Sequence, residues 1–271
     1  MNERGTETRL SIVMPVYNEA KTIAAAIDQV LAVDYPCPVE LIVVDDGSRD
    51  GSSTFLDGCA PRGVRVVRHP RNRGKGAALR SGVARATGTH LIVLDADLEY
   101  SASDIPAMLA PVLERRADHV FGTRIFGMNT CFRSFRFAMG GRVLTLLANL
   151  IFDSCLTDMH TCLKLVPTAH FRQLTLTENG FGLDTELTGR LLRGGVRPLE
   201  VPIRYTARSV EDGKKITWRD GMRCVSILIR VRLQRAQRLT SAPMPHVAVV
   251  TPLAAGRIPG AAGCADAAVA V

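Results

Sequence analysis

The sequence has little of what marks several common classes of protein. Only 5% of its residues are aromatic, and no recognition motif interleaves with its basic residues, so we expect no nucleic-acid partner. The seven cysteines are odd in number, widely spaced and free of any C-x-x-C pair. This usage argues against a disulfide framework and a zinc site, and it favours reduced thiols in a cytosolic protein.

Long hydrophobic runs are also missing. The longest lies near residues 143–152, VLTLLANLIF, which is short of the roughly 18 to 20 apolar residues that span a bilayer. The first residues, MNERGTETRL, lack the apolar centre of a signal peptide. From these two features we expect a soluble or peripheral protein.

The composition that is present supports a folded domain with an uneven charge. The 271 residues are 46% hydrophobic, which is enough for a sizeable core in one large or two small domains. The net charge is +8, and residues 204–238 hold ten Lys or Arg against three acids, a balance of +7 from ten minus three. Such a block favours a polyanion: nucleic acid, an anionic membrane surface or phosphate groups.

The order of apolar and polar stretches predicts an α/β fold. Short apolar runs typical of buried strands alternate with Ala-rich stretches of helical spacing over the first 125 residues. This alternation implies a mostly parallel sheet with helices on both faces. We expect strands at 10–16, 39–46, 64–69, 90–97, 119–125, 162–166 and 196–205, and helices at 19–31 and 74–88. Ligands of such sheets gather at the carboxyl ends of the strands.

We interpret residues 9–238 as one domain that ends in a basic amphipathic helix. Apolar residues recur at helical spacing near its end, at Trp218, Met222, Val225 and Ile229, while Arg219, Arg223 and Arg230 occupy another side. Ordinary core packing is the alternative for this helix and for the basic, apolar stretch RSFRFAMGGRVLTLL. Residues 1–8 and the Ala/Pro/Gly-rich residues 239–271 are predicted to be disordered.

Three carboxylates follow the apolar run in HLIVLDADLEY, residues 90–100. Because strand side chains alternate in direction, Asp95, Asp97 and Glu99 would share a face if the chain stayed extended. Like charges so placed repel unless a cation lies among them, and oxygen ligands suit Mg²⁺ or Mn²⁺. The alternative is a set of solvated acids at a strand end. The stretch is not an EF-hand loop, because its sixth position is Tyr100 and its twelfth is Pro106.

Two further polar clusters fall at predicted strand ends. Asp45 and Asp46 precede a Gly-Ser turn, where they can accept hydrogen bonds from a base or from ribose hydroxyls. The stretch NRGKGAAL is a glycine-rich opening to a helix, whose free N–H groups favour phosphate or a ribosyl edge. It is not a P-loop, because Gly76 occupies the Ser/Thr position.

These motifs, in this order, resemble the family 2 glycosyltransferases with the GT-A fold. The resemblance covers about residues 9 to 235 and rests on PVYNEA, VVDDGSRDGS, NRGKGAAL and the D-x-D triplet Asp95-Ala96-Asp97. Within that family, GTRIFG, LTDMHTCLKLV, ENGFGLDTEL and ARSVEDGKKI look most like the branch of dolichol-phosphate mannose synthases and polyprenyl-phosphate glycosyltransferases. The motifs are specific for the fold and reaction class and much less specific for the sugar.

The resemblance implies roles for individual residues. The nucleotide sugar would be bound by Pro15, Tyr17, Glu19, Val44, Asp46, Gly74, Lys75, Asp95 and Ala96. The ligands of Mg²⁺ or Mn²⁺ would be Asp95 and Asp97, with Glu99 as a third candidate. Catalytic roles fall on Asp97, Arg124, Arg208 and Lys214, and contacts to the acceptor phosphate on Arg124, Arg133, Arg136 and Arg208. Structural and catalytic roles are equally open for Asp184 and Glu186.

The expected reaction follows from these residues. We expect an inverting transfer of a sugar from a nucleotide diphosphate, a UDP-linked hexose or N-acetylhexosamine, to polyprenyl phosphate at the cytoplasmic membrane face. The protein would be peripheral, held by an anionic membrane surface or a membrane partner protein. A phosphate monoester has a second pKa near ~6, so its attack requires no strong general base. Two alternatives are a related transferase with a soluble acceptor and a catalytically silent sugar-nucleotide-binding or membrane scaffold subunit.

Overall fold

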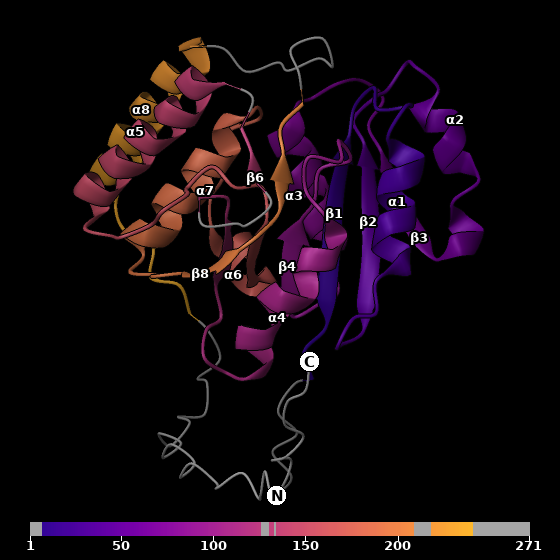
Figure 1. Ribbon diagram of the computed structural model, residues 1–271, viewed down its shortest axis with the longest axis horizontal. Coiled ribbons are helices and arrows are strands. Elements are labelled where there is room, and N and C mark those ends of the chain that lie inside the picture. Colours follow the sequence, from indigo (N-terminus) through magenta and orange to yellow (C-terminus); the bar gives the residue numbers. More distant parts are fainter. Residues whose placement is uncertain (1–6, 126–129, 133, 209–217, 241–271) are drawn as a thin grey trace, which may run out of the picture.

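A seven-stranded sheet forms the centre of the protein. The computed structural model describes residues 7–125, 130–132, 134–208 and 218–240, and Figure 1 shows its elements. The strand order is β3-β2-β1-β4-β7-β5-β8, and only β7 is antiparallel to its neighbours, β4 and β5. The strands are β1 (Leu10–Val16), β2 (Val39–Asp45), β3 (Val64–Arg68), β4 (His90–Val93), β5 (Val120–Thr123), β7 (Lys164–Pro167) and β8 (Leu199–Pro202). The predicted mostly parallel sheet is confirmed.

Eight α-helices and one short strand pair accompany the sheet in the described ranges. The helices are α1 (Ile23–Ala32), α2 (Ser52–Asp57), α3 (Lys75–Arg85), α4 (Ile105–Leu113), α5 (Phe135–Phe152), α6 (Thr168–Gln173), α7 (Gly182–Arg193) and α8 (Trp218–Leu233). The pair consists of β6 (Thr130–Cys131) and β9 (Tyr205–Thr206), which run parallel. Figure 1 shows α5 and α8 side by side at one end of the molecule, beside α7.

The connections place helices on both faces of the sheet. The chain passes from β1 through α1 to β2 in one direction, and from β3 through α3 back to β4 in the other. Because such crossovers are right-handed, helices on connections of opposite direction cover opposite faces. The direction in which the chain adds strands to the sheet therefore reverses at β1, which has β2 on one side and β4 on the other. A crevice opens outside the carboxyl ends of the strands at such a switch point, and ligands bind there.

The central strands are buried because they are covered on both faces. Ile12, Val13, Ile42, Val43 and Val44 are each 0% exposed, as expected of strands in a sheet between two layers of helices. Packing against α3 is especially close. A Cβ on Gly82 would lie 2.5 Å from the Val13 side chain and 3.0 Å from that of Val44, so glycine lets the helix approach β1 and β2.

Some predicted boundaries were wrong for physical reasons. The strand expected at 90–97 ends at Val93, and a turn follows in which Leu98 has a φ of +62°. The run at 196–205 splits into β8 and β9 around Ile203 and Arg204, where Ile203 is buried. The helix predicted from residue 19 begins at Ile23, because Glu19 to Thr22 form a turn closed by the Thr22 N–H on the Glu19 carbonyl.

The last helix packs on the fold through one face and exposes part of the apolar face expected from the sequence. Its buried residues are Cys224, Ile227, Leu228 and Val231, whereas Met222 and Ile229 are 61% and 49% exposed. Met222 and Ile229 of the predicted apolar face are therefore on the outside of α8, while Val225 is half-buried. No helix in the described parts of the chain is both long and apolar enough to cross a membrane.

Candidate active site

The acidic turn after β4 is the centre of the candidate site. It occupies the carboxyl end of β4, beside β1 at the switch point of the sheet. The Glu99 N–H donates to Asp97 Oδ1 at 3.0 Å. Burial, with repulsion from Asp95 and Glu99, raises the pKa of Asp97 to about 7. The turn therefore concentrates negative charge where a cation would relieve it.

The third carboxylate of the turn has partners of its own. Glu99 Oε2 accepts from the Tyr205 hydroxyl at 3.1 Å, and Oε1 accepts from the Arg208 N–H at 2.8 Å. In the described ranges, no three His, Cys, Asp or Glu side chains converge into a group that could hold a metal ion. The three-carboxylate set expected from an extended strand is thus not assembled, because the turn directs Glu99 toward Tyr205 and Arg208.

A partly buried chain of alternating charges leads away from Asp95. Lys75 Nζ lies 2.8 Å from Asp95 Oδ2 and 3.6 Å from Asp184 Oδ2, and Lys164 Nζ lies 3.3 Å from Asp184 Oδ1. Burial alone would raise the pKa of Asp184, but the two lysines outweigh it and hold that pKa below its ordinary value. Burial would likewise lower the pKa of Lys75, yet Asp95 and Asp184 keep it well above normal. These pKa shifts favour the charged forms of both Lys75 and Asp184.

Asp46 holds the glycine-rich loop. Its Oδ1 accepts from the Arg73 N–H at 2.9 Å and lies 2.6 Å from His69 Nδ1, and its Oδ2 accepts from the Gly74 N–H at 2.7 Å. Only 2% of Asp46 is exposed. These contacts make Asp46 a residue that positions the loop, and its contact with a base stays a prediction.

The glycines of NRGKGAAL serve close packing. Gly74 has a φ of +91°, and a Cβ there would lie 2.3 Å from the Asn179 carbonyl oxygen. A Cβ on Gly76 would lie 2.2 Å from the Glu178 carbonyl oxygen. The Gly76 N–H donates to Asn179 O at 2.7 Å, so one helix N–H group expected to be free for phosphate already has an acceptor. The N–H groups of loop residues 73 and 74 donate to Asp46.

The residues after β1 contribute one charged clamp to the site. Both terminal nitrogens of Arg208 lie 3.0 Å from Glu19 Oε2, and Arg208 Nε donates to the Asp97 carbonyl at 2.7 Å. Arg208 thus ties the acidic turn to the end of β1. Pro15 and Tyr17 are half-buried nearby in sequence, whereas the Val44 side chain lies in the core against α3.

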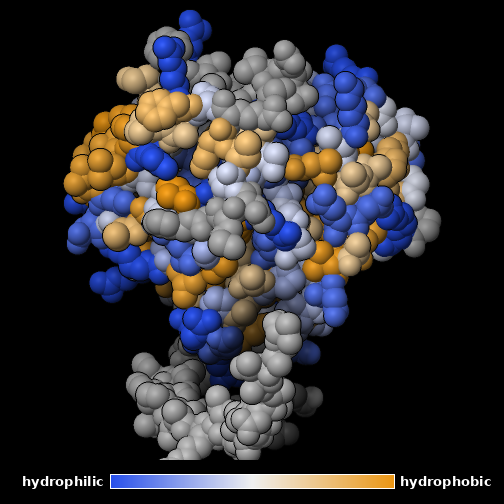
Figure 2. Space-filling model, in the orientation of Figure 1, coloured by the Kyte–Doolittle hydropathy of each residue, from blue (hydrophilic) through white to orange (hydrophobic). Residues whose placement is uncertain are grey.

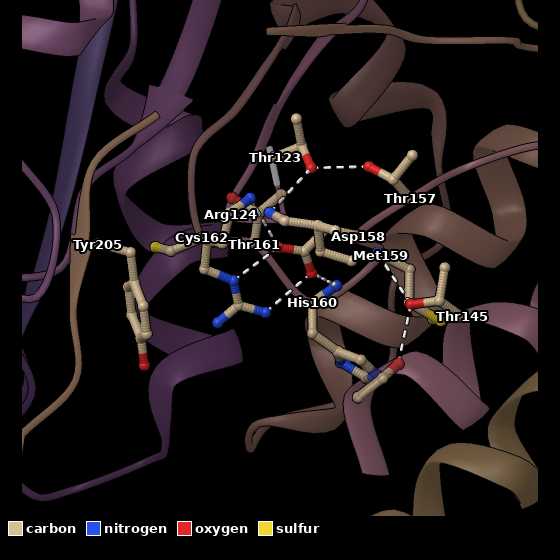
Figure 3. A network of polar contacts seen from close by, with 12 residues as sticks. Thr123, Arg124, Thr145, Thr157, Asp158, Met159, His160, Thr161, Cys162 and Tyr205 are labelled. Carbon is tan, nitrogen blue, oxygen red and sulfur yellow. Dashed lines mark hydrogen bonds and ion pairs between the residues drawn. The ribbon is translucent and has the colours of Figure 1, made fainter. Parts of the chain in front are cut away.

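Arg124 is locked in a second polar network, which Figure 3 shows. Its Nε and Nη2 donate to the two Asp158 oxygens at 2.6 and 2.8 Å, and its guanidinium lies 4.9 Å from the centroid of the Tyr205 ring. Burial would raise the pKa of Asp158, but the Arg124 contacts lower it below its usual range. Arg124 therefore has a fixed carboxylate partner in this structure.

The remaining predicted cations are distributed unevenly. Arg136 is exposed on α5, while Arg133 and Lys214 lie outside the described residues. Four arginines of the basic segment are paired with acids from elsewhere in the fold: Arg204 with Asp104, Arg208 with Glu19, and Arg223 and Arg230 with Glu178. Part of the local excess of +7 is therefore neutralised by folding.

The roles left open for Asp184 and Glu186 now separate. Asp184 belongs to the charge chain of the site. Glu186 is 0% exposed and accepts from the N–H groups of Thr177 and Glu178, both at 2.8 Å. Its function in the structure is to hold the segment that packs on Gly74 and Gly76.

Sequence reasoning missed Asp158 and Lys164 as parts of the site. Both lie in LTDMHTCLKLV, which contributed only to the resemblance. A lysine inside an apolar strand was the available signal, because lysine is almost never fully buried unless it is paired. Lys164 is 1% exposed and paired with Asp184.

Comparison with known proteins identifies the class and then the family. A mostly parallel sheet with a D-x-D turn at its switch point is the GT-A architecture, which confirms the predicted fold class. Residues 11–150 match the model described as glycosyl transferase family 2. The chain belongs to this family.

Relatives of the chain come from archaea and bacteria. It is 29% identical to the glycosyltransferase AglJ of Haloferax volcanii, over 75% of this chain and 65% of the relative. It is 34% identical to the dodecaprenyl-phosphate galacturonate synthase of Rhizobium johnstonii, over 45% of this chain and 38% of the relative. The chain thus spans less than two thirds of the length of these relatives.

The fold also resembles that of solved structures. Glucosyl-3-phosphoglycerate synthase from Mycobacterium tuberculosis superposes with a TM-score of 0.62 at 19% identity, covering 83% of this chain and 80% of that one. This likeness concerns the fold alone.

Proposed function

We propose that the protein transfers a sugar from a nucleotide diphosphate, a UDP-linked hexose or N-acetylhexosamine, to polyprenyl phosphate with inversion at the sugar carbon. The observation that carries the proposal is the convergence of Asp95 and Asp97 with Lys75 and Arg208 at the switch point of the sheet. Relatives named for dodecaprenyl phosphate and undecaprenyl phosphate support the acceptor class.

A divalent cation fits this site if the donor completes its coordination. Mg²⁺ is commonly held by one or two carboxylates together with substrate phosphates, and Asp95 and Asp97 supply two carboxylates. The raised pKa of Asp97 marks a negative charge that the surrounding residues leave uncompensated. When bound, Mg²⁺ or Mn²⁺ would neutralise charge on the leaving diphosphate. A related fold, glucosyl-3-phosphoglycerate synthase, has been crystallised with Mn²⁺ and UDP.

The residues of the chain would act on charge and position. An oxygen of the acceptor phosphate forms the bond to the sugar C1 while the bond from C1 to the diphosphate oxygen breaks. Negative charge then develops on the diphosphate, where Lys75 and Arg208 are placed to stabilise it. Since the acceptor phosphate is already an anion, no residue is required to deprotonate it.

We further propose that α5 and α8 hold the protein on the cytoplasmic face of the membrane. Large apolar side chains form an exposed stripe at helical spacing along α5: Phe135, Met139, Val143, Leu146 and Leu150. α8 lies beside it with Met222, Ile229 and Leu233 exposed, and Figure 2 shows hydrophobic surface at this end of the molecule. The sequence of α5 holds no acid and includes Arg136 and Arg142, which suits an anionic interface.

An acceptor panel tests the proposal. The purified protein is incubated with radiolabelled nucleotide sugars and Mn²⁺, with polyprenyl phosphate in one arm and soluble phosphorylated acceptors in another. Label in the organic phase supports the proposed reaction. Label only in a soluble product would favour a soluble acceptor, and no labelled product in either arm would favour a catalytically silent subunit.

A further inference from the structure

The segment between α6 and α7 joins two regions of the molecule that are far apart in sequence. Glu178 is 5% exposed, and its carboxylate receives hydrogen bonds from α8. Arg223 Nε and Nη2 donate to Oε2 at 3.0 and 2.8 Å, and Arg230 Nη2 donates to Oε1 at 2.8 Å. One buried carboxylate therefore binds two arginines that are about two turns apart on the same helix.

The backbone of the same residue contacts the glycine-rich loop. The Glu178 carbonyl accepts from Arg80 Nη1 at 2.7 Å and occupies the space that a Cβ on Gly76 would need. The next carbonyl, Asn179 O, accepts from the Gly76 N–H. Lys75 lies between Gly74 and Gly76 in the sequence, and its ammonium group pairs with Asp95.

We infer that Glu178 is a positioning residue for the donor site, which couples the placement of α8 to that of Lys75. The contacts run from Arg223 and Arg230 to Glu178, and from its backbone to the loop that Asp46 holds from the other side. The glycine-rich loop is thus hydrogen-bonded to Asp46 on one side and to the backbone of residues 178–179 on the other. The inference rests on the proposed function for the identity of the donor, while the coupling itself concerns this chain alone.

Arg223 and Arg230 are accessible at the surface, so an external partner can reach them. Their side chains remain 61% and 42% exposed although Glu178 is buried. An anionic surface that contacts α8 would compete with Glu178 for the same guanidinium groups. The donor site would therefore respond to whether α8 is engaged.

The substitution Glu178→Gln tests the inference, because it keeps the side-chain shape and the backbone contacts while removing the charge. Asp104→Asn is the matched control, since Asp104 also accepts from an arginine, Arg204, at 2.9 and 2.8 Å. We expect Glu178→Gln to weaken binding of UDP with Mn²⁺ in calorimetry roughly tenfold, the scale of one lost hydrogen bond to a charged group. The control should bind as the wild type does.

Two further readouts keep the outcome decisive. Amide hydrogen exchange at residues 73–80, measured without any ligand, should accelerate in Glu178→Gln and not in the control. The Arg223→Gln variant, whose arginine pairs with Glu178, should also accelerate exchange at residues 73–80. Combining it with Glu178→Gln should cause no further acceleration. Unchanged exchange overturns the coupling even if the wild type binds no UDP. Faster exchange with unchanged UDP affinity overturns the role at the donor site, whereas a wild type that binds no nucleoside diphosphate contradicts only the proposed function.

Discussion

Lys75 and Asp95 form an ion pair of 2.8 Å that joins the glycine-rich loop to the acidic turn. Their motifs are separated by a whole helix and a strand, and the ammonium group also reaches Asp184 at 3.6 Å. An ammonium group therefore already lies on the first carboxylate of the D-x-D triplet. This placement suits a site that receives a diphosphate, since Lys75 can stabilise charge that develops there.

Removing that ammonium group should slow transfer. We expect Lys75→Met to reduce the rate of sugar transfer roughly 10²-fold, the scale for loss of one group that stabilises transition-state charge. Lys21→Met, at an exposed lysine before α1, is the control and should transfer normally. Initial rates at saturating donor measure the effect. A Lys75→Met rate equal to that of the control would remove Lys75 from the mechanism.

The Arg124–Asp158 pair should stabilise the fold more than a surface pair does. Its side chains are 15% and 6% exposed, so Asp158→Asn leaves a buried guanidinium without its counter-ion, at a cost of about 3 kcal/mol. Asp28→Asn breaks the Arg62–Asp28 pair, whose side chains are 38% and 61% exposed, and should cost less than about 1 kcal/mol. Urea unfolding measures both. Equal losses would show that Asp158 is not the buried partner described.

Glycine substitutions should have opposite effects at two positions. Gly76→Ala places a Cβ 2.2 Å from the Glu178 carbonyl oxygen, so the backbones must separate and the variant should be destabilised. At Gly141 in α5, a Cβ would meet nothing within 4 Å among the described residues. Gly141→Ala should therefore stabilise by about 0.5–1 kcal/mol through its helix preference. The shift of the melting temperature gives the sign of each effect. A Gly76→Ala variant that melts no lower than the wild type would contradict the close packing at Gly76.

Acid should destabilise the protein through a buried histidine pair. His119 Nε2 lies 3.0 Å from His170 Nδ1, and burial, with the neighbouring His170 and His90, lowers the pKa of His119 to about 3. The unfolded chain, with a histidine pKa of about 6.5, then binds more protons than the folded protein between pH 3 and 6.5. The stability from His119 is full above about pH 6.5 and is lost as the pH falls, by up to about 1.4 kcal/mol per pH unit.

The measurement is the free energy of unfolding at pH 4 to 7 for the wild type and for His119→Gln. The carboxylates contribute equally to both proteins, so the difference in slope isolates the histidine. The variant should show the shallower loss toward acid. Parallel curves would mean that His119 titrates normally in the folded state.

A charge on the apolar stripe of α5 should weaken vesicle binding. Leu146 is 59% exposed, and burial of a leucine side chain contributes about 1.5–3 kcal/mol. Leu146→Glu should therefore lower the affinity for anionic vesicles roughly tenfold or more. Leu31→Glu changes an equally apolar residue, 42% exposed on α1, and should bind as the wild type does. If both variants sediment with vesicles to the same extent as the wild type, the membrane contact lies elsewhere.

The sequence predicted the parts of the molecule that depend on local pattern. The alternation of apolar runs gave the parallel sheet, and the motif order gave the family. Pattern could not show that the chain leaves the extended conformation after Val93, because the partners of Glu99 in that turn, Tyr205 and Arg208, lie more than 100 positions later.

The pairing of charges was equally beyond reach of local pattern. The basic block 204–238 holds most of the charge excess of the sequence, but Glu19, Asp104 and Glu178 form ion pairs with four of its arginines. The glycines of NRGKGAAL predicted a phosphate cradle, whereas their N–H groups and missing side chains accommodate Asp46 and the 178–179 backbone. Such partners become visible only when distant segments are placed together.

The most direct test of the account compares Asp97→Ala with the wild type in one assay. The measured quantity is radiolabelled sugar recovered in organic-extractable polyprenyl phosphate, with Mn²⁺ and with excess chelator. We expect efficient transfer by the wild type with Mn²⁺, and background counts for Asp97→Ala and for the chelated wild type, while Asp97→Ala keeps the wild-type fold by circular dichroism. Full transfer by Asp97→Ala, or by the chelated wild type, would contradict the proposal that the acidic turn after β4 holds the donor through a divalent metal.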